Sequence, residues 1–211
     1  MTNANFDGIA RSYALLEKVT SGNALARCRF RFLDWMQDAR HALAIGDGDG
    51  RFIAELLATN SEVEIDSVDT SAEMLRLQSL RSGQIPRLRL LQVDARLLIP
   101  PRNDYDLIVT HFFLDCLSQS EVNSLASRIA AHMRPGARWV LSDFAVPHRR
   151  ASRVLARLLV RALYFGFRIL TGLRIVRLPD HAAAFAAAGL RCVKSDTAFG
   201  GLLLSEQWQR E

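Results

Sequence analysis

The chain has 211 residues, of which 49% are hydrophobic and 23% charged, and its formal net charge is +5. This length suits one medium α/β domain, and the composition is ordinary for a globular protein that buries a core. The three cysteines form no C-x-x-C pair and no metal-ligand spacing, and no apolar signal segment follows the first residues, so we expect a cytoplasmic protein with reduced thiols and no metal.

Two helices are expected first, over residues 6–19 and 24–37, because apolar side chains recur there near helical spacing. Strands and helices then alternate along the chain. Strands are predicted over 41–46, 62–69, 87–94, 105–113 and 137–144, and helices over 51–59, 71–81 and 118–133. Ser71 is expected as an N-cap, since its hydroxyl can accept a hydrogen bond from the first helical turn.

This alternation predicts βαβ units, and therefore a parallel sheet that is covered by helices on both faces. The right-handed crossover rule favours a doubly wound arrangement, in which ligands bind at the carboxyl ends of the strands. Four residues lie at or just after predicted strand ends: Gly46, Asp69, Asp94 and His111. We therefore expect them to meet at one ligand site.

The pattern changes after residue 144. Residues 150–173 are predicted to form one or two helices with an arginine stripe that consists of Arg150, Arg153, Arg157, Arg161 and Arg168. Three arginines in the apolar part would each cost about 2.5–3.5 kcal/mol at a bilayer centre, so a membrane span is not expected. A cap helix over the sheet or a helix resting on a membrane surface fits better.

The last part of the chain predicts a helix over 179–190, which ends at Gly189, and then two antiparallel strands over 191–208. No repeat, low-complexity tract or linker divides the sequence, so a single domain over residues 1–211 is expected. Its parts are N-terminal helices (1–40), a cofactor-binding core (41–145), a helical cap (146–180) and a C-terminal helix with closing strands (181–211).

The loop "GDGDGR" after the first predicted strand raises a question of charge. A dinucleotide site needs G-x-G-x-x-G, but Arg51 stands at the sixth position, and Asp47 and Asp49 would repel a pyrophosphate. With a cationic ligand, the electrostatic interaction with these two aspartates becomes attractive. S-adenosylmethionine carries a sulfonium and an ammonium group, which Asp47 or Asp49 can face. The glycines that allow the backbone to approach it closely are Gly46, Gly48 and Gly50.

Residues of the next two strand ends fit the rest of this cofactor. Asp69 can accept hydrogen bonds from both ribose hydroxyls, and Asp94 can accept one from the adenine amino group. The Ala95 N–H can address a ring nitrogen, and Met74 can lie on the adenine face. Simpler interpretations are a helix N-cap for Asp69, a loop carboxylate for Asp94 and a core residue for Met74. The joint order and spacing of these positions favours the cofactor.

The segments "LAIGDGDGRF", "DSVDTSAEML", "LQVDARLL", "YDLIVTHFFLD" and "MRPGARWVLSDF" resemble the successive motifs of class I S-adenosylmethionine-dependent methyltransferases. The flanking segments are similar to those of ubiquinone/menaquinone-biosynthesis C-methyltransferases. The resemblance implies a Rossmann-like, mostly parallel seven-stranded sheet with a helical cap after the fifth strand. It also implies that Tyr13, Thr70 and His111 lie beside the cofactor, whose product would be S-adenosylhomocysteine.

The chain departs from the family pattern in the loop itself. Ala44 stands where many members have an acidic residue, two positions before the first glycine. Asp47 and Asp49 stand where Cys and Thr are frequent. These differences keep a second hypothesis open, in which the protein binds the cofactor but no longer catalyses a reaction. A nucleotide-dependent oxidoreductase is a third hypothesis, against which the loop argues.

Methyl transfer from a sulfonium is an in-line displacement, so positioning the acceptor and excluding water can supply most of the acceleration. A base is needed only if the acceptor loses a proton. His111 is the first candidate, because imidazole titrates near neutral pH, and Asp115 is the second. The simpler alternatives are a histidine that satisfies a backbone group and an aspartate that caps the following helix.

The acceptor is expected to be a small molecule. The mixture of Leu, Phe, Tyr and Arg over 150–176 favours either a lid over an apolar, quinone-like or lipid-like acceptor with peripheral contact to the inner face of the membrane, or a basic cap over a small soluble substrate. Nucleic acid is not expected as a partner, because no stacking platform or binding module is recognisable. The sequence does not determine the oligomeric state.

Overall fold

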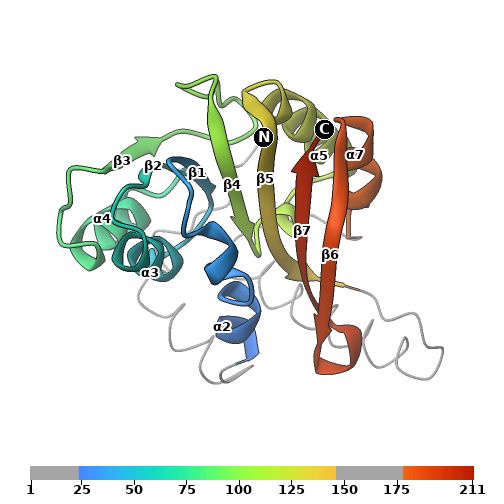
Figure 1. Cartoon of the computed structure of the whole chain (residues 1–211), viewed down its shortest axis with the longest axis horizontal. Coiled ribbons are helices and arrows are strands. Elements are labelled where there is room, and N and C mark those ends of the chain that lie inside the picture. Colours follow the sequence, from blue (N-terminus) through green and yellow to red (C-terminus); the bar gives the residue numbers. More distant parts are fainter. Residues whose placement is uncertain (1–23, 146–177) are drawn as a thin grey trace.

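The structure is a computed structural model that describes residues 24–145 and 178–211 (Figure 1). Several predictions therefore lie outside the described residues: the helix over 6–19 with Tyr13, nearly all of the cap over 146–180, and the arginine stripe. Within the described part, no helix is long and apolar enough to cross a membrane.

Seven strands form one sheet in the described chain. They are β1 (His41–Ile45), β2 (Glu64–Asp69), β3 (Leu88–Gln92), β4 (Tyr105–His111), β5 (Met133–Phe144), β6 (Leu190–Ala198) and β7 (Leu203–Arg210). Their order is β3-β2-β1-β4-β5-β7-β6, which Figure 1 shows from left to right. The pairs among β1–β5 are parallel, whereas β7 runs antiparallel to both β5 and β6. The predicted doubly wound, mostly parallel seven-stranded sheet is confirmed.

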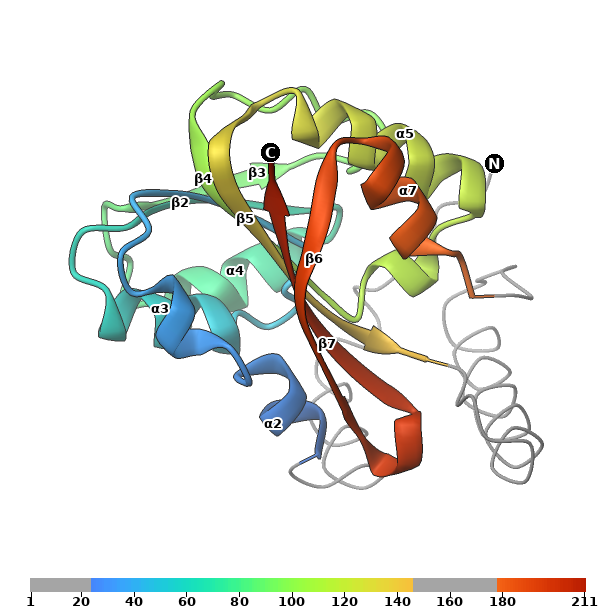
Figure 2. The ribbon, with the colours of Figure 1, turned by 45° about the vertical axis from the view of Figure 1, so that its right-hand side comes forward.

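Helices cover both faces of this sheet (Figure 2). The α-helices are α2 (Ala24–Arg29), α3 (Arg51–Thr59), α4 (Ala72–Arg81), α5 (Gln119–Ala130) and α7 (His181–Ala187). Short 3-10 turns are η1 (Leu33–Met36), η2 (Leu114–Cys116) and η3 (Phe199–Gly201).

Strand β1 shows how one strand serves two cores. Ala42 and Ala44 pack in the cluster that contains the apolar side chains of α3, whereas Leu43 and Ile45 pack in the cluster that contains those of α5 and α7. Successive side chains of a strand point to opposite faces, so a continuous apolar run is what a strand covered on both sides requires.

Two helix starts agree with the sequence. Ser71 caps α4 by accepting a hydrogen bond from the Met74 N–H, and Ser118 begins α5 in a reciprocal capping box with Glu121.

The C-terminus of α7 also lies close to the predicted position. Its C-cap is Ala188, and Gly189 follows in the left-handed region at φ 79°.

The expected single helix over 24–37 is wrong. Helix α2 ends at Arg29, and the chain continues in tighter turns, in which the Trp35 N–H donates to the Phe32 carbonyl three residues earlier, at 3.0 Å. The Phe30 ring stacks on Phe52 of α3, so tertiary packing of aromatic residues, which are weak helix formers, replaces the helical ladder.

The end of the predicted helix over 118–133 is also wrong. Helix α5 ends at Ala130, and Met133 already pairs with Tyr105 as the first residue of β5. The register of β4 and β5 shifts between Tyr105 and Leu107. This irregular stretch accommodates Pro135, which has no N–H to give to a ladder.

Candidate functional site

The carboxyl ends of β2, β1 and β4 lie side by side, because these strands are neighbours in the sheet. The loop after β1 starts at Gly46, whose N–H donates to the Val68 carbonyl of β2 at 2.9 Å. Asp69 ends β2 and His111 ends β4. Strand β3 is the parallel neighbour of β2, and the Val93 N–H just before Asp94 donates to the Asp69 carbonyl at 3.1 Å. The structure therefore brings all four strand ends that the sequence singled out to one edge of the sheet.

The loop conformation requires glycine at two positions in particular. Gly46 has φ 71°, and a Cβ there would lie 2.4 Å from the Phe113 ring. Gly50 has φ 79°, and its Cβ would lie 2.8 Å from the Cα of Gln78 on α4. Both the left-handed backbone and the close neighbours exclude a larger residue. The backbone of the loop thus lies directly against the Phe113 ring at Gly46 and against α4 at Gly50.

Asp47 is a buried carboxyl group with one unused oxygen. Its Oδ2 accepts a hydrogen bond from the Ile53 N–H of α3 at 3.1 Å, whereas Oδ1 is buried and has no partner among the described residues. Burial raises the pKa of Asp47 to about 7, although the charge of Arg29 opposes this shift. A buried acceptor without a donor is costly, so this oxygen is suited to a ligand that donates a hydrogen bond or carries positive charge.

Asp49 has a different environment, although it lies only two residues further along. Its Oδ2 lies 3.0 Å from Arg51 Nε and 3.0 Å from Arg81 Nη2. Its charge is therefore balanced by two arginines of the protein itself. The predicted contact of Asp49 with a cofactor stays a prediction, but the structure offers a separate reason for its presence.

His111 is buried at the end of β4, and neither of its ring nitrogens has a hydrogen-bond partner in the described parts of the chain. Its ring packs edge-on against Phe52, with 4.6 Å between the centroids. Burial, together with the charge of Arg29, lowers the pKa of His111 well below its usual range. The imidazole is therefore neutral at physiological pH and keeps one nitrogen that can accept a proton.

Asp115 lies in η2 and does not cap α5, whose N-cap is Ser118. Its backbone N–H donates to Oδ2 of the buried Asp143 on β5 at 3.2 Å, and its own Oδ1 lies 3.5 Å from Cys116 Sγ. Burial, and secondarily the nearby Asp115 carboxylate, raises the pKa of Asp143 well above its usual range. The predicted capping alternative for Asp115 is thus wrong, and its catalytic role stays a prediction.

The β2–α4 connection holds three further predicted residues. Asp69 Oδ1 accepts a hydrogen bond from the Ser71 N–H at 2.9 Å, while Thr70 is exposed. Met74 is buried in the first turn of α4. These contacts organise the turn and leave their roles toward a cofactor as predictions.

Asp94 and Ala95 follow β3. Arg96 forms an ion pair with the Asp94 carboxylate, and hydrogen bonding from this arginine lowers the pKa of Asp94. Ala95 is buried, and its carbonyl accepts a hydrogen bond from Arg128 Nη2 of α5 at 2.9 Å. The predicted adenine contacts of this turn are not tested by the structure.

Sequence reasoning missed three residues around the loop: Arg29, Gln78 and Arg81. Arg29 on α2 is buried, and its guanidinium lies 5.8 Å from the centre of the Phe112 ring. A buried arginine within the apolar stretch "ALARCRFRF" was the available signal. Gln78 and Arg81 had none, because their partners in the loop and on β2 are distant along the chain.

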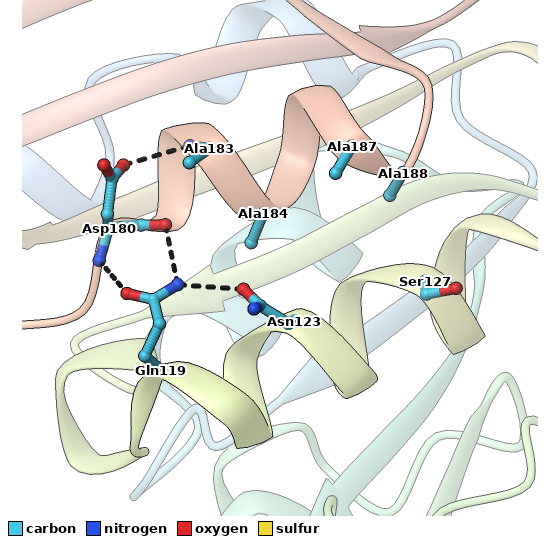
Figure 3. A pocket seen from close by; sticks show the side chains of 8 residues that line it. All are labelled: Gln119, Asn123, Ser127, Asp180, Ala183, Ala184, Ala187 and Ala188. Atoms are coloured by element: carbon cyan, nitrogen blue, oxygen red, sulfur yellow. Dashed lines mark hydrogen bonds between the residues drawn. The ribbon is translucent and has the colours of Figure 1, made fainter.

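A groove of about 510 Å³ lies elsewhere, between α5 and α7 (Figure 3). Figure 3 shows Gln119 bridging Asn123 and the backbone of Asp180 at one end, with alanines of α7 along its length. None of the predicted site residues lines it. The groove is therefore separate from the strand-end site.

Comparison with known proteins agrees with the fold. Residues 43–139 match a family model described as a methyltransferase domain. The ubiquinone/menaquinone biosynthesis C-methyltransferase UbiE of Stutzerimonas stutzeri is 28% identical over 151 residues, which span 67% of this chain and 57% of that protein. The chain thus covers little more than half of this relative.

Two solved structures illustrate the similarity of fold. The mitomycin 7-O-methyltransferase MmcR has a TM-score of 0.70 at 19% identity, and the match covers 98% of this chain and 61% of that one. The N-methyltransferase NodS of Bradyrhizobium japonicum, solved with S-adenosylhomocysteine, has a TM-score of 0.65 at 14% identity over 90% of this chain and 89% of that one. Residues 43–139 of the chain thus match the methyltransferase-domain model, and the fold is shared with solved methyltransferases.

Proposed function

We propose that the protein transfers the methyl group of S-adenosylmethionine to a small, apolar acceptor. The observation that carries this proposal is the glycine loop at the end of β1, which contains Asp47 and ends near His111 of β4. Both are buried and keep polar atoms without a hydrogen-bond partner among the described residues. An unused carboxylate oxygen and a neutral imidazole suit a ligand with cationic groups better than they suit a pyrophosphate.

The residues around the loop fit the charges of this cofactor. Its amino-acid end carries an ammonium and a carboxylate, and the α2 side of the loop holds the buried Asp47 carboxyl and the buried Arg29 within electrostatic reach of each other. In this proposal Asp47 faces the ammonium and Arg29 the carboxylate. Asp69 holds the ribose, and Asp94 and Ala95 recognise the adenine, as the sequence predicts.

The bound cofactor supplies an activated methyl group, and the protein supplies orientation, a dry environment and, where needed, a proton acceptor. The neutral His111 can accept a proton, although its low pKa makes it a weak base that would act best on an acceptor whose proton is already acidic. Asp115 on the neighbouring turn is the second candidate. Both roles require the acceptor to lose a proton during transfer.

The acceptor is proposed to be quinone-like or lipid-like. The support is the apolar and basic composition of residues 150–176, together with the relative whose name refers to ubiquinone and menaquinone biosynthesis. The similar structures include enzymes named for O- and N-methylation, so the screen should include acceptors with oxygen, nitrogen and carbon as the methylated atom.

Isothermal titration with S-adenosylmethionine, S-adenosylhomocysteine and NADH tests the cofactor. Micromolar binding of the first two and none of NADH supports the proposal and opens an acceptor screen that begins with hydroquinones and lipids. No binding of the first two overturns it. Binding without turnover of any acceptor would favour the second candidate, a catalytically silent cofactor-binding protein, which the departures at Ala44, Asp47 and Asp49 keep open.

Peripheral membrane contact through residues 150–176 is part of the same proposal. Neutralising Arg153, Arg157 and Arg161 should weaken co-sedimentation with anionic liposomes at low salt. A matched control neutralises two exposed arginines of the described surface, Arg76 and Arg191. Equal binding of both variants and the original protein would remove the membrane hypothesis and leave a soluble acceptor.

A further inference from the structure

Helix α4 binds the backbone of the glycine loop through two side chains, Gln78 and Arg81, that have no role in the proposed methyl transfer. Gln78 is completely buried, and its Nε2 donates to the Gly48 carbonyl at 2.9 Å. Arg81, one turn later, donates from Nε to the Asp49 carbonyl at 3.0 Å. Two successive carbonyl groups of the loop are therefore held by the same helix.

Gln78 is itself fixed from behind. Its Oε1 accepts a short hydrogen bond of 2.6 Å from the Ser67 hydroxyl of β2. Its backbone and side-chain carbons also occupy the space beside Gly50, where a Cβ would come within 2.7 Å of Gln78 Cγ. Gln78 thus sets both the distance between α4 and the loop and the direction of the Gly48 carbonyl.

Peptide geometry links the direction of these two carbonyl groups to the direction of the N–H groups that follow them. In a trans peptide the carbonyl and the following N–H point in opposite directions. Because the Asp49 carbonyl points to Arg81, the Gly50 N–H points away from α4, where it donates to the Asp47 carbonyl at 3.4 Å. By the same rule, the Gly48 carbonyl bound to Gln78 directs the Asp49 N–H away from α4.

We propose that Gln78 and Arg81 are positioning residues for the Asp49 N–H. Gln78 holds the Gly48 carbonyl against α4 and thereby aims this N–H at the bound cofactor, and Arg81 holds the carbonyl of Asp49 itself and so fixes the following peptide of the loop. This inference rests on the proposed cofactor. The ion pair of Arg81 with Asp49 Oδ2 acts in the same direction, since it keeps the carboxylate on the α4 side of the loop and away from the ligand side.

The first experiment measures the affinity for S-adenosylhomocysteine of Gln78→Met, which keeps the length of the side chain but loses both hydrogen bonds. A lost neutral hydrogen bond corresponds to roughly a three- to tenfold change in affinity, and we expect a loss of that size. Ser67→Ala is the matched control, because it removes the bond behind Gln78 and keeps the bond to Gly48. Its affinity should stay within about twofold of the original protein.

The double variant Ser67→Ala/Gln78→Met separates positioning from stability. In Gln78→Met the buried Ser67 hydroxyl loses its acceptor, which costs stability. The double variant removes this orphaned hydroxyl, so thermal unfolding should return toward that of Ser67→Ala while the affinity stays low. If affinity recovers together with the unfolding temperature, Gln78 is merely structural and the inference is wrong.

Arg81→Met provides a variant in which folding is less at risk, since the Arg81 side chain is 43% exposed. We expect a loss of affinity of about threefold or more, whereas Arg76→Met, on the same helix and paired with Glu73 one turn earlier, should bind normally. In amide NMR, the Asp49 signal should respond to S-adenosylhomocysteine in the original protein and respond less in Arg81→Met.

The outcomes separate the two proposals. If the original protein binds neither S-adenosylmethionine nor S-adenosylhomocysteine, the proposed function fails. If it binds S-adenosylhomocysteine and both Gln78→Met and Arg81→Met bind equally well, the positioning inference fails while the proposed function stands.

Discussion

The two aspartates of the glycine loop have opposite environments, Asp49 on the side that faces α4 and Asp47 on the side that faces α2. On the α4 side, the Asp49 carboxylate is paired with Arg51 and Arg81, and the adjacent carbonyl is also bound. On the α2 side, Asp47 is buried, and neither its Oδ1 nor the ring of His111, which is buried at the end of the neighbouring strand β4, has a hydrogen-bond partner among residues 24–145 and 178–211. In this part of the chain the polar groups on the α4 side are therefore paired, whereas those on the α2 side are available to a ligand.

This difference bears on why a glycine loop carries two aspartates. Arginines of the protein balance the charge of Asp49, whereas the proposed ligand faces Asp47. Buried polar groups in native proteins nearly always have hydrogen-bond partners. Buried groups without such a partner at the carboxyl edge of the strands, where ligands bind in this type of sheet, therefore indicate a ligand site. A carboxylate that the protein itself pairs indicates a structural role.

The largest expected effect is on kcat, from a change at His111 on the α2 side of the loop. His111→Ala should lower kcat about a hundredfold if the imidazole accepts the proton of the acceptor, while affinity for S-adenosylhomocysteine stays within about threefold. Steady-state kinetics and titration on the same preparation check this. If affinity falls as much as the rate, His111 is a binding residue and not a base.

The next effect concerns the backbone on the α4 side. Gly50→Ala should lower the free energy of unfolding by about 2–3 kcal/mol, because it adds left-handed strain to a contact with the backbone of Gln78. Urea unfolding measures this. Gly83→Ala is the matched control, since Gly83 also has a positive φ but no atom within 4 Å of its Cβ position, and it should lose only about 1 kcal/mol.

A direct test of the comparison exchanges the two aspartates for their neutral isosteres. Asp47→Asn should weaken binding of S-adenosylmethionine about tenfold, because it removes the charge that faces the cation. Asp49→Asn should change this affinity by at most about threefold and should cost about 1 kcal/mol of stability or less, since the arginines are partly exposed. The reverse order of affinities, measured by titration calorimetry, would show that the ligand faces Asp49.

The last effect is a pH dependence of about the size expected for Asp47→Asn, and it also comes from Asp47. Its pKa is raised from 3.8 to about 7, so the stability that its proton contributes is present below pH 3.8 and is lost as the pH rises through 7. A cationic ligand demands the opposite, namely the deprotonated form. Affinity for S-adenosylmethionine should therefore fall about tenfold from pH 8 to pH 6, with proton release on binding, and Asp47→Asn should abolish this dependence. The charged or titratable neighbours are Arg29, Asp49, Asp69 and His111.

Within the described residues, the sequence alone determined the order of strands and helices from β1 onward, the glycine loop, the N-cap at Ser71, the start of α5 near Ser118, and the edge at which Gly46, Asp69, Asp94 and His111 lie. These follow from hydrophobic periodicity and local turn chemistry, which operate within a few residues. The boundaries were less accurate where distant residues compete, as at Arg29, where aromatic packing on α3 ends the helix, and at Met133, where pairing with Tyr105 begins the strand.

Only the tertiary structure decided which aspartate of the loop is balanced and which is not. Asp47 and Asp49 share glycine neighbours and the same charge, and the local pattern distinguishes them only by Arg51, two residues after Asp49. The rest of their difference comes from Arg81 and Arg29, which lie 32 residues after Asp49 and 18 residues before Asp47 along the chain. Electrostatic environment and burial depend on distance in space rather than along the chain, and the fold alone sets that distance.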